Sequence, residues 1–124
     1  MARFIIEGGH PLNGVVVPSG NKNAAQPILA ASLLTDEPVT ITNLPDIIDV
    51  RTMIEMLSEM GAQVTVHDQH SVTVRSSSVN RTVLDGDLAH TIRGSLLFAG
   101  PLLARYGHAR LSPPGGCVIG RRGI

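Results

Sequence analysis

The sequence has little of what marks a secreted, membrane-bound or nucleic-acid-binding protein. It contains one cysteine, its aromatic residues make up 2% and its formal net charge is zero. One cysteine cannot form an internal disulfide, and a neutral chain with few aromatics lacks both a general attraction to phosphate backbones and platforms for stacking bases. No apolar run reaches the ~20 residues that cross a bilayer, and the first residues lack the long apolar region of a secretion signal. These absences predict a cytoplasmic protein that binds neither nucleic acid nor membranes.

What the sequence does contain predicts one small domain of mixed α/β type. Hydrophobic residues make up 43% and charged residues 16%, a balance that supports a packed interior. The hydrophobic spacing predicts the order β-β-α-β-α-β-β-α-β. Strands are expected at 3–9, 13–20, 38–45, 62–68, 71–77 and from 108 onward, and helices at 22–34, 46–62 and 90–107.

Local signals predict where the helices begin, end and bend. Ser19 or Asn21 can cap the first helix, and Gly61 is expected to stop the second. The pair Gly100-Pro101 predicts a kink or an interruption in the third helix.

Two stretches of the chain echo each other. Residues 38–51 and 108–121 both read as a strand, a proline-containing turn and an apolar segment that ends in arginine. In the first copy the turn leads into a helix, and in the second the sequence given stops at Ile124, where that helix should begin. Such echoes are typical of repeated supersecondary units, so we expect the chain to stop within a unit.

Lys22 is the only lysine in the chain, and it lies where the first helix is expected to start, in "PSGNKNAAQPILAASLL". One interpretation is a solvated lysine in a surface turn. The other is an anion site, because free N–H groups and the dipole at a helix start favour negative charge. A lysine is also a compact charge that can meet a phosphate closely.

Cys117 lies in the glycine- and proline-rich stretch "SPPGGCVIGRRG" (112–123). A lone cysteine can be a small buried hydrophobe. Here the stretch reads as an exposed loop, and Arg121 and Arg122 follow closely. Because nearby cations increase the thiolate fraction of a thiol, a reactive cysteine is the alternative interpretation.

Arg93 lies in the apolar stretch "HTIRGSLLFAGPLL" and must reach solvent, form a pair or bind a ligand. A structural ion pair with Asp85 or Asp87 is the alternative. The five histidines show no metal-ligand spacing, and His67 and His70 are expected to be solvated beside a hairpin turn. We expect neither a metal nor a cofactor.

Three stretches together, "PSGNKNAAQPILAASLL", "TIRGSLLFAGPLLARYG" and "PPGGCVIGRR", closely resemble the N-terminal part of the UDP-N-acetylglucosamine 1-carboxyvinyltransferases. The resemblance also includes "LPDIIDVRTMIEMLSEMGA". It implies transfer of the enolpyruvyl group of phosphoenolpyruvate to the 3-hydroxyl of UDP-N-acetylglucosamine, with release of phosphate, in the first committed step of peptidoglycan synthesis. It also implies two similar domains built from βαβαββ-like repeats, with residues 1–21 in the second domain and 22–124 in an incomplete first domain.

The resemblance also implies roles for individual residues. Lys22 and Asn23 match the pair that contacts phosphoenolpyruvate, and Arg93 matches an arginine on the UDP-sugar side. Cys117 matches the loop cysteine that donates a proton and is alkylated by fosfomycin. Arg122 matches a substrate-binding arginine, although Gly-Arg-Arg-Gly stands here where the family usually has Gly-Ala-Arg-Pro.

Family members are more than three times as long, so the resemblance implies a fragment whose remaining catalytic groups come from the rest of the enzyme. On its own it is expected to be inactive and to expose apolar faces of helices 22–34 and 90–107. Two alternatives stay open. One is an enzyme similar to 5-enolpyruvylshikimate-3-phosphate synthase, and the other is an inactive relative that binds a sugar nucleotide or a partner protein.

Overall fold

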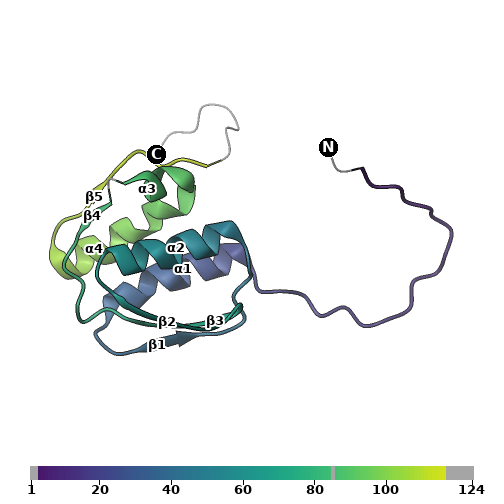
Figure 1. The fold of residues 1–124 in the computed structure, drawn as a ribbon, viewed down its shortest axis with the longest axis horizontal. Coiled ribbons are helices and arrows are strands. Elements are labelled where there is room, and N and C mark those ends of the chain that lie inside the picture. The colour runs from purple at the N-terminus through teal and green to yellow at the C-terminus, as the bar shows by residue number, and fades with distance from the viewer. Residues whose placement is uncertain (1–2, 85, 117–124) are drawn as a thin grey trace.

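A computed structural model of the chain describes residues 3–84 and 86–116. A three-stranded sheet is covered on one face by two helices, and a second group of helices with a two-stranded sheet lies on their far side (Figure 1). The strands are β1 (Val39–Ile41), β2 (Gln63–Asp68), β3 (Ser71–Arg75), β4 (Val83–Leu84) and β5 (Arg110–Leu111). The helices are α1 (Lys22–Ala31), η1 (Ser32–Leu34), α2 (Ile48–Glu59), α3 (Asp87–Thr91), η2 (Arg93–Phe98) and α4 (Ala99–Tyr106), where η marks a 3-10 helix.

The three-stranded sheet has the order β1-β3-β2, and both pairings are antiparallel. The hairpin of β2 and β3 confirms the sequence prediction. Val72 and Val74 of β3 are buried and point toward the helices, while Thr73 between them pairs with Thr40 of β1 through a 2.8 Å hydroxyl hydrogen bond. Period-two alternation therefore sets which face of the sheet is covered.

The helix α1 begins as its sequence predicts. The side-chain oxygen of Asn21 accepts hydrogen bonds from the backbone N–H groups of Asn23 and Ala24, at 2.8 and 3.1 Å. Asn21 rather than Ser19 is therefore the cap. Gly61, at φ +96°, follows α2 in the left-handed conformation that suits glycine, which confirms the predicted stop.

The third predicted helix, 90–107, is wrong as a single element. The backbone is extended at Ile92 (φ −133°, ψ 149°), so α3 ends there and a 3-10 turn begins at Arg93. A second interruption, where η2 ends at Phe98 and α4 begins at Ala99, comes next to Gly100-Pro101 as predicted, and this pair lies in the first turn of α4. Proline is tolerated in a first turn because the N–H that it lacks has no partner within the helix.

The core lies between the helices rather than on one side of the sheet alone. The side chains of Leu29, Leu33, Phe98 and Leu102 are fully buried where α1 and η1 meet η2 and α4. The expectation that helices 22–34 and 90–107 expose their apolar faces is therefore wrong for most of each face, because the two segments cover each other. The fully buried side chains of α2 and the sheet join the same cluster: Met53, Met56, Leu57, Met60, Val72 and Val74.

Residues 3–18 leave the body of the molecule in an extended path (Figure 1). The strands predicted at 3–9 and 13–20 are not formed, because a strand needs a hydrogen-bonded neighbour and these residues have none within the described part of the chain. Their apolar side chains are exposed, with Phe4 at 87% and Val15 at 93%. The assignment of residues 1–21 to a second domain stays a prediction.

Each of the two stretches that echo each other contains a strand, and the repeat itself stays a prediction. β1 and β5 occupy matching places in the two stretches, and each follows a helical segment. Their pairing differs, since β1 is antiparallel to β3 and β5 is parallel to β4. The segment that should form the helix of the second stretch lies outside the described residues.

Candidate functional site

A hollow of about 820 Å³ opens where the starts of α1 and α2 meet the junction of α3 with η2. It gathers residues that are far apart in the sequence, including three that the resemblance marks: Lys22, Asn23 and Arg93. Gly115 and Gly116, which lead directly into Cys117, line the same hollow. The full lining is Lys22, Asn23, Gln26, Ile48, Asp49, His90, Thr91, Ile92, Arg93, Gly94, Gly115 and Gly116.

The charge of Lys22 is held at the edge of this hollow. Its ammonium nitrogen lies 2.5 Å from a carboxylate oxygen of Asp49, in the first turn of α2. The Lys22 side chain is 50% exposed and that of Asp49 is 23% exposed. Lys22 is therefore neither a freely solvated lysine nor a buried one, and half of its side chain remains open to an incoming anion.

Fewer backbone N–H groups are free to bind an anion at the start of α1 than the sequence suggested. The cap residue Asn21 already takes the N–H groups of Asn23 and Ala24. The attraction for an anion at this point therefore rests on the dipole of α1 and on the Lys22 ammonium more than on those two donors.

Asp49 and Gln26 were missed by the sequence analysis. Gln26 is 8% exposed, and its side-chain nitrogen donates to the same Asp49 oxygen at 3.3 Å. One feature of the sequence does indicate a role for Gln26. Gln26 follows Lys22 by one helical turn and so shares its face, and a polar residue on the buried side of an apolar helix needs a partner.

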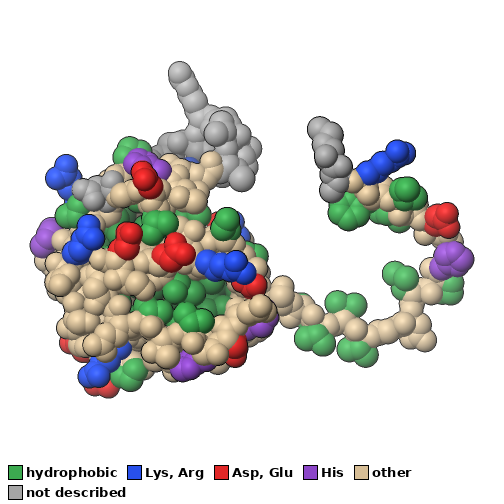
Figure 2. All heavy atoms as spheres, viewed as in Figure 1, with side chains coloured by type: hydrophobic (Ala, Val, Ile, Leu, Met, Phe, Trp, Pro, Cys, Tyr) green, Lys and Arg blue, Asp and Glu red, His purple; other side chains and the backbone are tan. Residues whose placement is uncertain are grey.

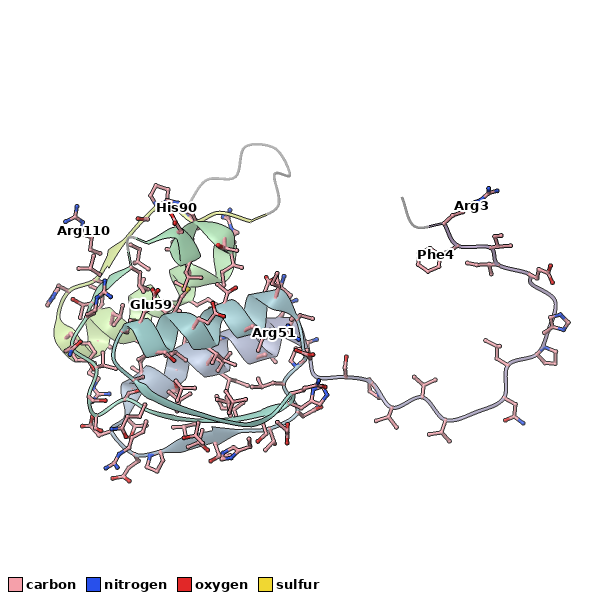
Figure 3. All side chains as sticks on the ribbon, viewed as in Figure 1. Arg3, Phe4, Arg51, Glu59, His90 and Arg110 are labelled. Atoms are coloured by element: carbon pink, nitrogen blue, oxygen red, sulfur yellow. The ribbon has the colours of Figure 1, made fainter. Side chains whose placement is uncertain are left out.

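Two glycines bring the walls of the hollow together. A Cβ on Gly115 would lie 1.3 Å from the backbone oxygen of His90, and one on Gly94 would lie 2.8 Å from the side-chain nitrogen of Gln26. The segment after β5 therefore lies directly against α3, near the labelled His90 (Figure 3). Only glycine permits this approach, so backbone contact holds residues 115 and 116 against the hollow.

Arg93 is exposed at the start of η2 and lines the hollow from that side. Arg93 also makes an interaction with another part of the chain. Because the predicted long helix is broken at this point, the guanidinium does not have to escape from an apolar interior. Cys117, Arg121, Arg122 and Asp85 lie outside the described residues.

The described histidines have structural partners or lie on the surface. His67 bonds the hydroxyl of Thr73, and His70 bonds the backbone oxygen of Leu44. Within residues 3–84 and 86–116, no three His, Cys, Asp or Glu side chains are grouped to hold a metal ion. No helix in that part of the chain is long and apolar enough to cross a membrane.

A second hollow, of about 570 Å³, lies between α2 and the hairpin of β2 and β3. Hydrophobic side chains gather there in Figure 2, and the residues that line the hollow include Val50, Ile54 and Val66. Its one arginine, Arg51, is paired with Asp46 at 2.5 Å. An apolar floor suits a small anion poorly, so the hollow around Lys22 is the better candidate for a phosphorylated substrate.

Comparison with known proteins agrees with this geometry. The family model described as EPSP synthase (3-phosphoshikimate 1-carboxyvinyltransferase) matches residues 6–124. The chain belongs to this family. It is 49% identical over all 124 residues to a UDP-N-acetylglucosamine 1-carboxyvinyltransferase of Coxiella burnetii, and 48% identical over 120 residues to one of Bradyrhizobium diazoefficiens. The chain covers 29% and 28% of these two relatives.

A solved structure shows the same fold. The enolpyruvyl transferase NikO from Streptomyces tendae superposes with a TM-score of 0.73 at 36% identity, over 86% of this chain and 25% of that one. The predicted fold class and the predicted resemblance are both confirmed. The relatives' names favour the UDP-N-acetylglucosamine enzymes over the shikimate enzyme as the nearer group.

Proposed function

We propose that this chain forms one side of the active site of a UDP-N-acetylglucosamine 1-carboxyvinyltransferase. The enzyme would transfer the enolpyruvyl group of phosphoenolpyruvate to the 3-hydroxyl of UDP-N-acetylglucosamine and release phosphate. The observation that carries the proposal is the hollow that unites Lys22, Asn23 and Arg93 with the glycines before Cys117.

The charges around the hollow suit the two substrates. The half-exposed ammonium of Lys22 meets the phosphate or carboxylate of phosphoenolpyruvate, with the amide of Asn23 beside it. Arg93, which lines the hollow from η2, is suited to the negative charge of a nucleotide sugar, since a guanidinium binds phosphate in a fixed fork geometry. The substrates would then lie in the hollow, with the reacting groups near the loop.

Cys117 and Arg122 are proposed to complete this side of the site. Gly115 and Gly116 line the hollow, which supports the proposal that the next residue, Cys117, donates a proton to the bound substrate through its thiol. The same thiol is the proposed point of attack by fosfomycin. Arg122 is proposed to bind substrate after the loop, and the rest of the enzyme to supply the base at the sugar hydroxyl.

The cellular setting follows from this reaction and is part of the proposal. Both substrates are small, water-soluble metabolites, so the enzyme would work in the cytoplasm and supply peptidoglycan synthesis, and through it cell-wall growth and division. No cofactor, metal, nucleic acid or membrane is required by the transfer.

A chimaera tests the proposal. In the Coxiella burnetii relative, the segment that aligns with this chain is replaced by residues 1–124. The exchange is possible because the similarity covers all of this chain. We expect phosphate release that requires both phosphoenolpyruvate and UDP-N-acetylglucosamine, with a product heavier than the nucleotide sugar by one enolpyruvyl group. A folded chimaera that binds the nucleotide sugar by calorimetry and releases no phosphate would favour the inactive-relative alternative.

A further inference from the structure

Asp49 contacts both of its neighbours in the hollow through one oxygen atom. That oxygen lies 2.5 Å from the Lys22 ammonium and 3.3 Å from the Gln26 side-chain nitrogen. The carboxylate thus lies between a half-exposed cation and a buried amide. Lysine has a flexible four-carbon stem, so a fixed anion beside it decides where the charge is found.

Gln26 is itself held in place. It is buried in α1, and the backbone of Gly94 lies so close to its amide that an added Cβ would come within 2.8 Å of the nitrogen. Gly94 follows Arg93 directly in η2. The chain of contacts therefore runs from the Arg93 segment through Gln26 and Asp49 to Lys22, and it joins the two walls of the hollow.

We propose that Asp49 is a positioning residue for Lys22 and that Gln26 fixes Asp49. This inference rests on the proposed function, because it concerns where the ammonium meets the anionic substrate. A cation held near its working position needs no rearrangement when the substrate arrives, and a displacement of about 1 Å can cost ~100-fold in rate. Neither residue is proposed to touch the reacting atoms.

A purely electrostatic role for Asp49 predicts the opposite result. If the carboxylate only weakened the positive charge of Lys22, Asp49→Asn would bind phosphoenolpyruvate more tightly and lower its KM without loss of kcat. Positioning predicts that Asp49→Asn lowers kcat by about 10-fold or more, since a misplaced ammonium stabilises the transition state less well. Gln26→Leu, which keeps the volume and removes the donor, should lower kcat by a smaller factor.

The kinetic test uses the chimaera with Asp49→Asn, Lys22→Ala and the double variant. If Asp49 acts through Lys22, Asp49→Asn has no further effect on kcat once Lys22 is alanine. Asp46→Asn is the matched control, because Asp46 lies three residues earlier and forms an equally short ion pair, with Arg51, outside this hollow. The control should leave kcat unchanged. The proposal would be overturned if the losses of kcat in Asp49→Asn and Lys22→Ala multiply in the double variant. It would also be overturned if Asp49→Asn lowers KM and keeps the full kcat.

A second readout needs no activity. Lys22 is the only lysine in residues 1–124, so its acetylation by a limiting amount of acetic anhydride can be followed by mass spectrometry of one peptide. Loss of the contact with Asp49 should increase the rate at which Lys22 is acetylated. We expect a several-fold increase in Asp49→Asn, a smaller one in Gln26→Leu and none in Asp46→Asn. Equal rates in all variants would show that Asp49 does not hold Lys22. An inactive chimaera with this labelling pattern would instead contradict the proposed function and leave the contact itself established.

Discussion

At the scale of single residues, the ion pair of Lys22 and Asp49 explains why one lysine stands among arginines. A surface ion pair of this exposure contributes only about 0.2–1 kcal/mol to folding, so stability does not account for it. A compact ammonium can lie against a carboxylate and still present its free side to a phosphate. A guanidinium is planar and larger, and would fill the edge of the hollow differently.

We predict that Lys22→Ala reduces turnover of the chimaera by at least about 100-fold, and that Lys22→Arg recovers little of it. The reason is that arginine keeps the charge and changes the shape and reach of the group that carries it. Initial rates of phosphate release measure both variants. A Lys22→Arg rate near that of the parent would mean that charge alone matters at this position.

Cys117 gives a second prediction at this scale. If the loop that begins at Gly115 and Gly116 closes over substrate, fosfomycin should add to the Cys117 thiol of the chimaera, and faster when UDP-N-acetylglucosamine is bound. Intact-protein mass spectrometry detects the adduct. Cys117→Ser should give none, and an adduct elsewhere in the chimaera would show that this loop has been assigned wrongly.

At the scale of elements, the junction of α3 with the segment after β5 positions the loop. Gly115 lies against the His90 backbone, which leaves no space for a side chain. Since backbone atoms cannot give way as a flexible side chain can, a methyl group here must push the segment off α3. Gly115 and Gly116 would then lose their place in the lining of the hollow.

We therefore expect Gly115→Ala to lower kcat by about 10-fold or more and to lower the melting temperature. Gly100→Ala is the matched control. Gly100 lies in α4, no heavy atom is near its would-be Cβ, and alanine favours a helix over glycine by up to about 1 kcal/mol. Calorimetry compares the melting temperatures of the two variants, and steady-state kinetics compares their kcat values. A Gly115→Ala variant as active and stable as the parent would show that the segment is not held against α3.

The elements also show what the sequence could predict and what it could not. The cap at Asn21, the stop at Gly61 and the hairpin were predictable because each depends on a few adjacent residues. The break at Ile92 was not, since the apolar pattern runs straight through it and only packing against α1 and α2 decides it. Asp49 was missed for the same reason, because its contact with Lys22 joins two helices.

At the scale of the whole molecule, the described chain has a packed core and an unpacked leading segment. The helices bury each other, while residues 3–17 carry exposed Phe4, Ile5, Ile6 and Leu12 and a run of three exposed valines at 15–17. The chain spans less than a third of the curated relatives it matches. An exposed apolar segment of this kind is expected to pair with other polypeptide, either the remainder of an enzyme or other copies.

We predict that residues 1–124 alone self-associate and release no phosphate from the two substrates. Analytical ultracentrifugation measures the self-association, and the phosphate assay measures the activity. Removal of residues 1–17 should shift the distribution toward monomer, because the packed body, unlike the leading segment, covers most of its apolar side chains. A monomeric chain, or phosphate release that Cys117→Ser abolishes, would contradict this view of the molecule.

The central claim is that the hollow around Lys22 binds phosphoenolpyruvate in a transferase. The most direct measurement is the rate of phosphate release by the chimaera carrying Lys22→Ala, compared with the chimaera carrying Arg51→Ala. Both substitutions break a 2.5 Å ion pair at the start of α2, and only Lys22 lines the hollow. The account predicts that Arg51→Ala keeps the parent rate and that Lys22→Ala loses about 100-fold or more. Equal rates in the two variants would contradict it.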